Sequence, residues 1–138
     1  MTASTIRFLA VSSLITLLGP LGVMAQGPVQ FTIPFGFTVG PKSFAAGNYR
    51  VEEATSQVLR IRSTDGRANM VVLTHSDEPG KNPGKAALSF HRYGDRYFLY
   101  KVSNDHRGWG LPQSVHEKEL IAEQASPRQL DVLASNGK

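Results

Sequence analysis

The segment VQFTIPFGFTV, residues 29–39, alternates apolar residues with polar or small ones along its whole length. A period of two puts alternate side chains on opposite faces, which is typical of a strand with one buried and one solvated face. Pro34 has no amide hydrogen to give to a central ladder. The segment therefore predicts a β-strand that lies at an edge or breaks in two at Pro34.

Similar alternation recurs along the chain in short pieces. The Gly47-Asn48 pair is typical of a turn, and a second strand is expected to begin at Tyr49. Further strands are expected over residues 57–62, 86–92, 96–103 and 129–134. Two Pro-Gly pairs predict a polar loop over residues 77–85, and residues 104–112 are expected to be irregular.

Two hairpins are predicted. Asp65-Gly66 is a strong two-residue turn signal, and closing the chain on it pairs apolar with apolar residues. The expected pairs are Thr64 with Arg67, Ile61 with Met70, and Leu59 with Val72. The second hairpin turns at residues 93–95 and leaves two registers open. The apolar pattern favours Phe90 opposite Phe98, whereas a strict two-residue turn places Phe90 opposite Leu99.

One helix is predicted, over residues 114–124. Ser114 and Glu117 form an S-x-x-E capping box, in which the hydroxyl accepts from the amide of Glu117 and the carboxylate returns to the cap. Pro127 prevents continuation. The residues expected to form the packing face of this helix are Val115, Leu120 and Ile121.

These elements predict a mainly β fold. We expect a single domain over residues 26–138, built as a small antiparallel β-sandwich or partly open barrel of about six to seven strands with one C-terminal helix. The chain contains no cysteine, so neither disulfides nor a thiolate metal site can stabilise it.

Residues 1–25 have the composition of a secretory signal peptide. Arg7 precedes an apolar run over residues 8–18, Gly19-Pro20 breaks the run, and small residues lead to an expected cleavage after Ala25. The run is about half the ~20 residues that a membrane-spanning helix needs. Cleavage predicts an exported protein, periplasmic or extracellular, without a membrane span. The alternative is an uncleaved N-terminal anchor.

The charge of the expected mature chain is weakly positive. Losing Arg7 leaves 14 of the 15 Lys and Arg residues against 11 Asp and Glu, a net charge of about +3. Such a small, dispersed excess does not point to a nucleic-acid partner. An envelope protein or a polysaccharide is the expected type of partner.

Three stretches together resemble a known family. They are residues 33–40 (IPFGFTVG), 44–51 (FAAGNYRV) and 90–99 (FHRYGDRYFL), followed by Leu111-Pro112 before the helix. The chain resembles an uncharacterised family of small exported all-β proteins common in acidobacteria and other soil bacteria. Members often carry Asp where Gly36 stands and Pro where Ala45 stands. The resemblance implies an exported β fold, and it carries over no activity and no site residue.

The sequence suggests no catalytic, cofactor or metal site. The four histidines, His75, His91, His106 and His116, lie on different predicted elements rather than at ligand spacing. No G-x-S-x-G motif is present. Glu52 and Glu53 are adjacent on a strand, so their side chains point to opposite faces and cannot act as a pair.

The best candidate for ligand contact is the second hairpin tip together with the only tryptophan. The candidate residues are His91, Arg92, Tyr93, Arg96, Tyr97 and Trp109. Arginine beside tyrosine can stack and could hold an anionic sugar, a lipid headgroup or a polymer strand. The alternative is a hairpin whose charges pair locally and whose tyrosines flank the core, with Trp109 as a lid over one end of the core.

Three functions are compatible with these observations. The favoured hypothesis is a non-catalytic exported domain with a binding or assembly role in the periplasm or envelope. The first alternative is a carrier of a small molecule, either an apolar ligand or a glycan. The second alternative is a hydrolase that uses scattered polar residues near His91 or His106.

Overall fold

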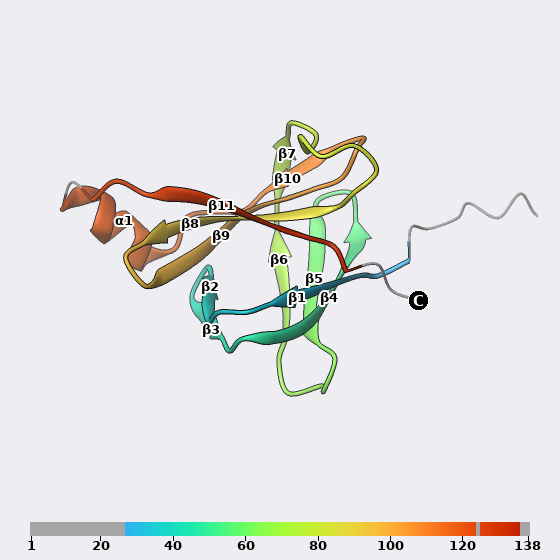
Figure 1. Cartoon of the computed structure of the whole chain (residues 1–138), viewed down its shortest axis with the longest axis horizontal. Coiled ribbons are helices and arrows are strands. Elements are labelled where there is room, and N and C mark those ends of the chain that lie inside the picture. The colour runs from blue at the N-terminus through green and yellow to red at the C-terminus, as the bar shows by residue number, and fades with distance from the viewer. Residues whose placement is uncertain (1–26, 124, 136–138) are drawn as a thin grey trace, which may run out of the picture.

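The computed structural model describes residues 27–123 and 125–135, which form two β-sheets and one helix (Figure 1). The signal peptide predicted for residues 1–25 lies outside the described residues. The predicted mainly β fold is confirmed, since the two sheets are not closed into a barrel, which agrees with a sandwich or a partly open barrel. The strands of the two sheets cross one another in Figure 1, and the apolar core lies where the sheets meet.

The first sheet has four antiparallel strands in the order β1-β4-β5-β6. They are β1 (Val29–Ile33), β4 (Gly47–Thr55), β5 (Val58–Ser63) and β6 (Asn69–Leu73). The second sheet has the order β11-β8-β9-β10-β7, and β2 and β3 join it through β9. Its strands are β2 (Phe37–Val39), β3 (Lys42–Phe44), β7 (His75–Asp77), β8 (Ala87–Tyr93), β9 (Arg96–Ser103), β10 (Gly108–Gly110) and β11 (Arg128–Leu133).

Eleven strands are present in the described part of the chain, rather than the six to seven predicted. The difference consists of β2, β3, β7 and β10, which have three residues each. Such short strands carry too little alternation to be recognised in a sequence.

The alternating segment of residues 29–39 breaks at Pro34, as predicted, and changes sheet there. β1 pairs with β4 in the first sheet, whereas β2 pairs with β3 and contacts β9 in the second. Phe31 and Ile33 before the break and Phe37 and Val39 after it are all buried. The alternation therefore marked the buried face correctly on both sides of the break.

Both predicted hairpins form. In the first, Ile61 lies opposite Met70 and Leu59 opposite Val72, as expected. Gly66 in its turn has φ of 77°, a conformation that glycine adopts without steric cost. In the second, the two-residue turn sets the register, so Phe90 lies opposite Leu99. A bulge then shifts the pairing between Ser89 and Phe90, which leaves Tyr100 as the extra residue of β9.

The irregular structure expected over residues 104–112 is wrong in part, because β10 pairs there with both β9 and β7. The glycines on either side of Trp109 permit this close pairing. A Cβ on Gly108 would overlap the carbonyl oxygen of Glu78, and a Cβ on Gly110 would overlap the His75 ring. Trp109 lies between them with its side chain buried.

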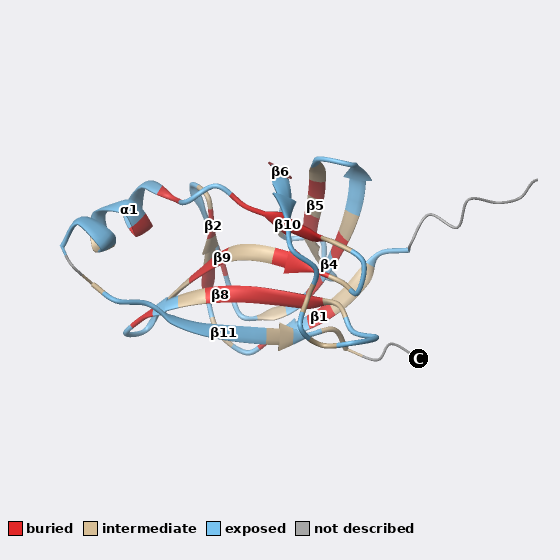
Figure 2. Cartoon of the chain, turned by 90° about the horizontal axis from the view of Figure 1, so that it is seen from above, coloured by how far each residue is buried: buried red, intermediate tan, exposed pale blue. Residues whose placement is uncertain are grey.

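The helix, α1 (Val115–Ala122), forms with Ser114 as its N-cap, but its predicted apolar packing face is wrong. Val115 is 68% exposed and Ile121 is 42% exposed, and within the helix only Glu117 is buried. The helix lies at one end of the second sheet (Figures 1 and 2). The Glu117 carboxylate, rather than an apolar stripe, contacts the sheet. Among the described residues, no helix combines the length and apolarity that a bilayer span requires.

Candidate ligand-binding cavity

The six candidate contact residues do not gather at one place. His91, Arg92, Tyr93, Arg96 and Tyr97 lie on the β8–β9 hairpin, near α1. Trp109 is on β10, opposite Val102, at the other end of β9. The structure therefore separates the hairpin tip from the tryptophan, and each has its own surroundings.

His91 and Tyr93 face a buried carboxylate rather than solvent. His91 Nδ1 lies 2.5 Å from Oε1 of Glu117, and the Tyr93 hydroxyl donates to the same oxygen at 3.2 Å. Glu117 is 1% exposed. Its amide donates to Ser114 Oγ at 3.0 Å, which is the first half of the expected capping box. Its carboxylate does not return to the cap as expected, because it bonds to the sheet.

This buried cluster changes the acidity of a tyrosine. Burial, and then the Glu117 carboxylate, raise the pKa of Tyr93 to about 12. Both effects disfavour the phenolate, the first by removing water and the second by like-charge repulsion. The His91 ring stacks on Tyr100, with ring centroids 3.8 Å apart. Glu117, His91 and Tyr93 thus hold α1 against β8.

The other three hairpin residues are more exposed. The Arg92 guanidinium lies 5.4 Å from the ring centroid of Tyr97, which itself stacks on Phe35 at 3.8 Å. The stacking of arginine on tyrosine is therefore present, although Arg92 Nε also donates to the Gly94 carbonyl. Arg96 and Tyr97 line a hollow together with His116 and with residues of β2 and β3.

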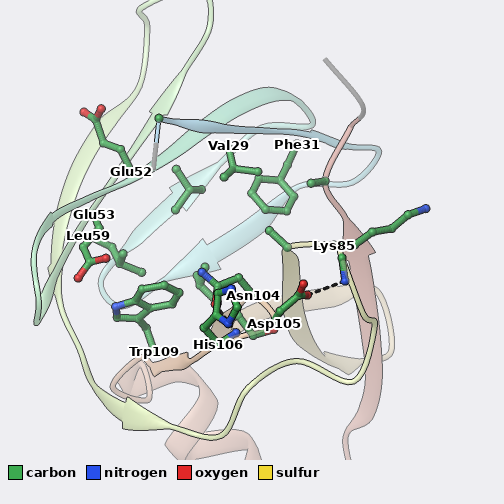
Figure 3. Close-up of a pocket in the computed structure, with 17 residues that line it drawn as sticks. Val29, Phe31, Glu52, Glu53, Leu59, Lys85, Asn104, Asp105, His106 and Trp109 are labelled. Carbon is green, nitrogen blue, oxygen red and sulfur yellow. Dashed lines mark hydrogen bonds between the residues drawn. The ribbon is translucent and has the colours of Figure 1, made fainter. Parts of the chain in front are cut away.

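Trp109 lines a separate cavity of about 340 Å³ at the far end of the sandwich (Figure 3). Its apolar walls come from both sheets. They consist of Val29, Phe31, Val51, Leu59, Ala86, Val102, Trp109 and Ala134. Figure 3 shows Val29, Phe31 and Leu59 pointing toward the same space as Trp109. The volume lies at the lower end of the range typical of small-molecule sites, about 300–1,000 Å³.

Trp109 is held from one side by an arginine. The Arg107 guanidinium lies 4.6 Å from the indole ring centroid. The same guanidinium donates to Glu53 Oε1 at 3.0 Å and to the Ser56 carbonyl at 2.7 Å. Arg107 therefore ties the segment that carries Trp109 to the β4–β5 turn. In the described part of the chain, the buried indole Nε1 has no hydrogen-bond partner.

The mouth of the cavity is polar and ordered by local hydrogen bonds. Asp105 Oδ1 accepts from the Gly84 amide at 2.7 Å, which joins two loops that border the mouth. Asn104 Oδ1 accepts from the amides of His106 and Arg107, each at 2.9 Å. Figure 3 shows the Lys85 side chain pointing away from the cavity. The site thus combines an apolar interior with a polar rim.

The residues present do not form a metal centre. Within residues 27–123 and 125–135, no three His, Asp or Glu side chains converge closely enough to hold an ion. The three carboxylates that line the cavity are also engaged, Glu52 by Arg60, Glu53 by Arg107 and Asp105 by the Gly84 amide. An apolar interior with polar groups at its mouth can bind and orient a molecule in the cavity.

The sequence indicates Trp109 as a candidate but not the residues that surround it. Val29, Phe31 and Leu59 were recognised as members of a buried face, and Glu53 and Arg107 had no visible relation. Glu53 and Arg107 are 54 positions apart, so no local spacing could have linked them. The only local signal is the pair of glycines around the tryptophan, which lies in the segment expected to be irregular.

Comparison of the chain with protein-family models, curated proteins and solved structures gives no match.

Proposed function

We propose that this protein is an exported, non-catalytic binding domain that holds a small, largely apolar molecule in the cavity beside Trp109. The cavity between the two sheets is the observation that carries the proposal, because eight apolar residues from both sheets line it. A mostly apolar, concave site with a few polar groups is the usual form of a small-molecule pocket.

The chemistry of the lining favours an uncharged or weakly polar ligand. Burial of apolar surface contributes about 25 cal/mol of favourable free energy for each Å² removed from water. Apolar walls therefore bind the apolar part of a ligand more tightly than a polar one. The polar lining residues include three neighbours in the sequence, Asn104, Asp105 and His106. A hydroxyl or carbonyl at one end of the ligand could exchange hydrogen bonds there while the remainder stays in the interior.

One further observation supports a binding role over catalysis, and another supports export. The Glu53 carboxylate is held in an ion pair, and the Asp105 carboxylate accepts a backbone amide, so neither is poised as a free base. Residues 1–25 have the composition of a signal peptide, and the family resemblance also implies export. The proposed place of action is the periplasm or the exterior of the cell.

The proposal is tested with ligand copurification and with an intrinsic fluorophore. Native mass spectrometry of freshly isolated protein should show a bound mass that is lost on denaturation. Because Trp109 is the only tryptophan, titration with the neutral probe N-phenyl-1-naphthylamine should change tryptophan fluorescence in a saturable way. Decanol should then displace the probe.

A matched pair of variants locates the binding. Ala134→Leu adds three carbons beside the cavity and should abolish probe binding. Ala122→Leu adds the same carbons to an exposed position at the end of α1 and should leave binding unchanged. A purely apo mass combined with no probe binding, or equal binding by both variants, would contradict the proposed function.

A further inference from the structure

β6 forms one edge of the first sheet. It comes last in the order β1-β4-β5-β6, and no described strand pairs with its outer side. Such an edge presents unpaired backbone donors and acceptors, which can template an added strand. β11, at one edge of the second sheet, has a different chemistry.

Hydrogen bonds at both ends of the β5–β6 hairpin show which backbone groups of β6 point outward. The Thr74 amide donates to Gln57 and the Ser63 amide donates to Ala68, each at 2.8 Å. Bonded pairs alternate along an antiparallel ladder, so Met70 and Val72 bond to β5. The N–H and C=O groups of Asn69, Val71 and Leu73 therefore point to the open side. Consistently, Lys42 Nζ donates to the Asn69 carbonyl at 3.1 Å.

The same residues present apolar side chains to solvent. Val71 is 54% exposed and Leu73 is 72% exposed, both on the outer face of the sheet. Free backbone groups and exposed apolar side chains thus coincide at two successive outward positions. An incoming extended chain could pair with both at once.

The β11 edge is protected in ways that β6 is not. The Ala134 amide donates to Ala86, so the outward residues of β11 are Gln129, Asp131 and Leu133. Asp131 places a charge in the middle of that edge, a common defence against strand addition. Its end is also closed, because the Ser135 amide donates to the Gln30 carbonyl of β1.

One end of the β6 edge is cationic. Cross-strand pairing places Arg50, Arg62 and Asn69 in one row across the sheet, and Lys42 contacts Asn69 from the side. The next row contains Glu52, Arg60 and Val71, and Glu52 already pairs with Arg60 and Arg62. A side chain added opposite Asn69 would therefore meet an excess of positive charge.

We propose that β6 binds an extended segment of a partner protein as an added antiparallel strand. Read from its N-terminus, the segment has the pattern apolar-x-apolar-x-acidic. The two apolar residues lie opposite Leu73 and Val71, and the acidic residue lies opposite Asn69. The backbone of the segment supplies the hydrogen bonds, and alternate side chains supply selectivity. Its amide replaces Lys42 at the Asn69 carbonyl, and the released ammonium pairs with the acidic side chain.

A second copy of this chain fits the edge less well. β6 has the sequence NMVVL, so another β6 has no carboxylate to place opposite Asn69 in any register. Two copies would bring their cationic ends to the interface without compensation. Charge complementarity thus favours a partner of different sequence.

The test uses fluorescein-labelled peptides and fluorescence anisotropy. The peptide Ser-Val-Thr-Val-Thr-Glu-Ser should bind saturably, and the same peptide with Lys in place of Glu should bind about tenfold more weakly. Val71→Pro removes an outward N–H without removing a bond to β5, since proline is tolerated where that group faces solvent. This variant should lose peptide binding, whereas Val71→Thr should retain it.

Controls separate edge pairing from misfolding and from self-association. Circular dichroism should show that Val71→Pro retains the fold. If it does not, Leu73→Lys takes its place, with the same expected loss of binding. The proposal is overturned if neither peptide binds, if the folded edge variant binds like the wild type, or if sedimentation shows a dimer that the edge variant disrupts. Probe binding in the cavity is a separate measurement, so failure of either proposal can be recognised alone.

Discussion

The two ends of the second sheet bury polar groups in opposite ways. At the α1 end, the Glu117 carboxylate is fully buried and bonds to both His91 and Tyr93. At the other end, Trp109 borders an open cavity, and its buried indole N–H has no partner among the described residues. The first end is closed by a satisfied polar network. The second end keeps space between the sheets.

This difference indicates which end is structural and which is suited to a ligand. A buried carboxylate is expensive unless it is hydrogen-bonded, and Glu117 contacts both the His91 ring and the Tyr93 hydroxyl. That network fixes the helix to the sheet, and its polar atoms are already hydrogen-bonded to one another. The cavity end exposes apolar walls to a space large enough for a small molecule.

The largest loss of stability is expected from a substitution at the closed, α1 end. Glu117→Ala should lower the free energy of unfolding by about 3 kcal/mol, because His91 and Tyr93 lose their buried carboxyl partner and α1 loses its contact with β8. Urea denaturation measures the change. Glu119→Ala is the matched control, since the contact of Glu119 with His116 is exposed and should be worth less than about 1 kcal/mol. Equal effects of the two variants would contradict a structural role for the network.

A smaller loss of stability should appear in strong alkali. The pKa of Tyr93 is raised to about 12, so the folded protein holds this proton more tightly than the unfolded chain, in which tyrosine titrates near 10. The contribution of Tyr93 to stability is therefore complete below pH 10 and is lost as the pH rises from 10 to about 12. Thermal unfolding across this range measures the loss.

Tyr93→Phe provides the control for this titration. The variant should lose stability less steeply between pH 10 and 12 than the wild type. Some dependence should remain, because burial also raises the pKa of Tyr49 and of Tyr100, with the same sign. An unchanged slope in Tyr93→Phe would show that this hydroxyl is not the responsible group.

Substitutions at the open, cavity end should reduce stability less. Arg107→Ala removes a stacking contact with Trp109 and partly exposed bonds to Glu53 and Ser56, which together should cost about 1 kcal/mol. The tryptophan emission spectrum should also shift, since the guanidinium lies over the ring. Arg96→Ala, an exposed arginine at the other end, should leave the spectrum unchanged. A shift of equal size in both variants would contradict the stacking.

The smallest effect is expected on the outer surface of α1. Ile121→Lys should change the free energy of unfolding by less than about 0.5 kcal/mol, because this side chain is exposed. Leu88→Ala, in the buried core, should cost about 2–5 kcal/mol in the same assay. A large loss of stability in Ile121→Lys would contradict the exposed position of this side chain and would support the apolar packing face predicted from the sequence.

Local signals in the sequence predicted the parts of the fold that depend on neighbouring residues. The Asp65-Gly66 hairpin formed with its expected register, because turn chemistry and apolar pairing agree there. In the β8–β9 hairpin these two signals disagreed, and the turn determined the pairing nearest the tip. The bulge at Tyr100 was not predictable, since it involves the stacking of Tyr100 on His91 across the sheet.

The candidate site was less predictable because it depends on segments that are distant in the sequence. Glu117 fits a capping box by spacing alone, but its carboxylate bonds to residues 24 and 26 positions away. Alternation shows that Phe31 and Leu59 face inward. It does not show how far apart the two sheets lie at that end, which determines whether there is a cavity.

The change of sheet at Pro34 has a consequence for folding. One short run of chain, residues 29–39, contributes β1 to the first sheet and β2 to the second, with core side chains on both sides of the break. Neither sheet can assemble fully without positioning a strand of the other. The two sheets should therefore gain and lose their structure together as one cooperative unit, rather than as separable halves.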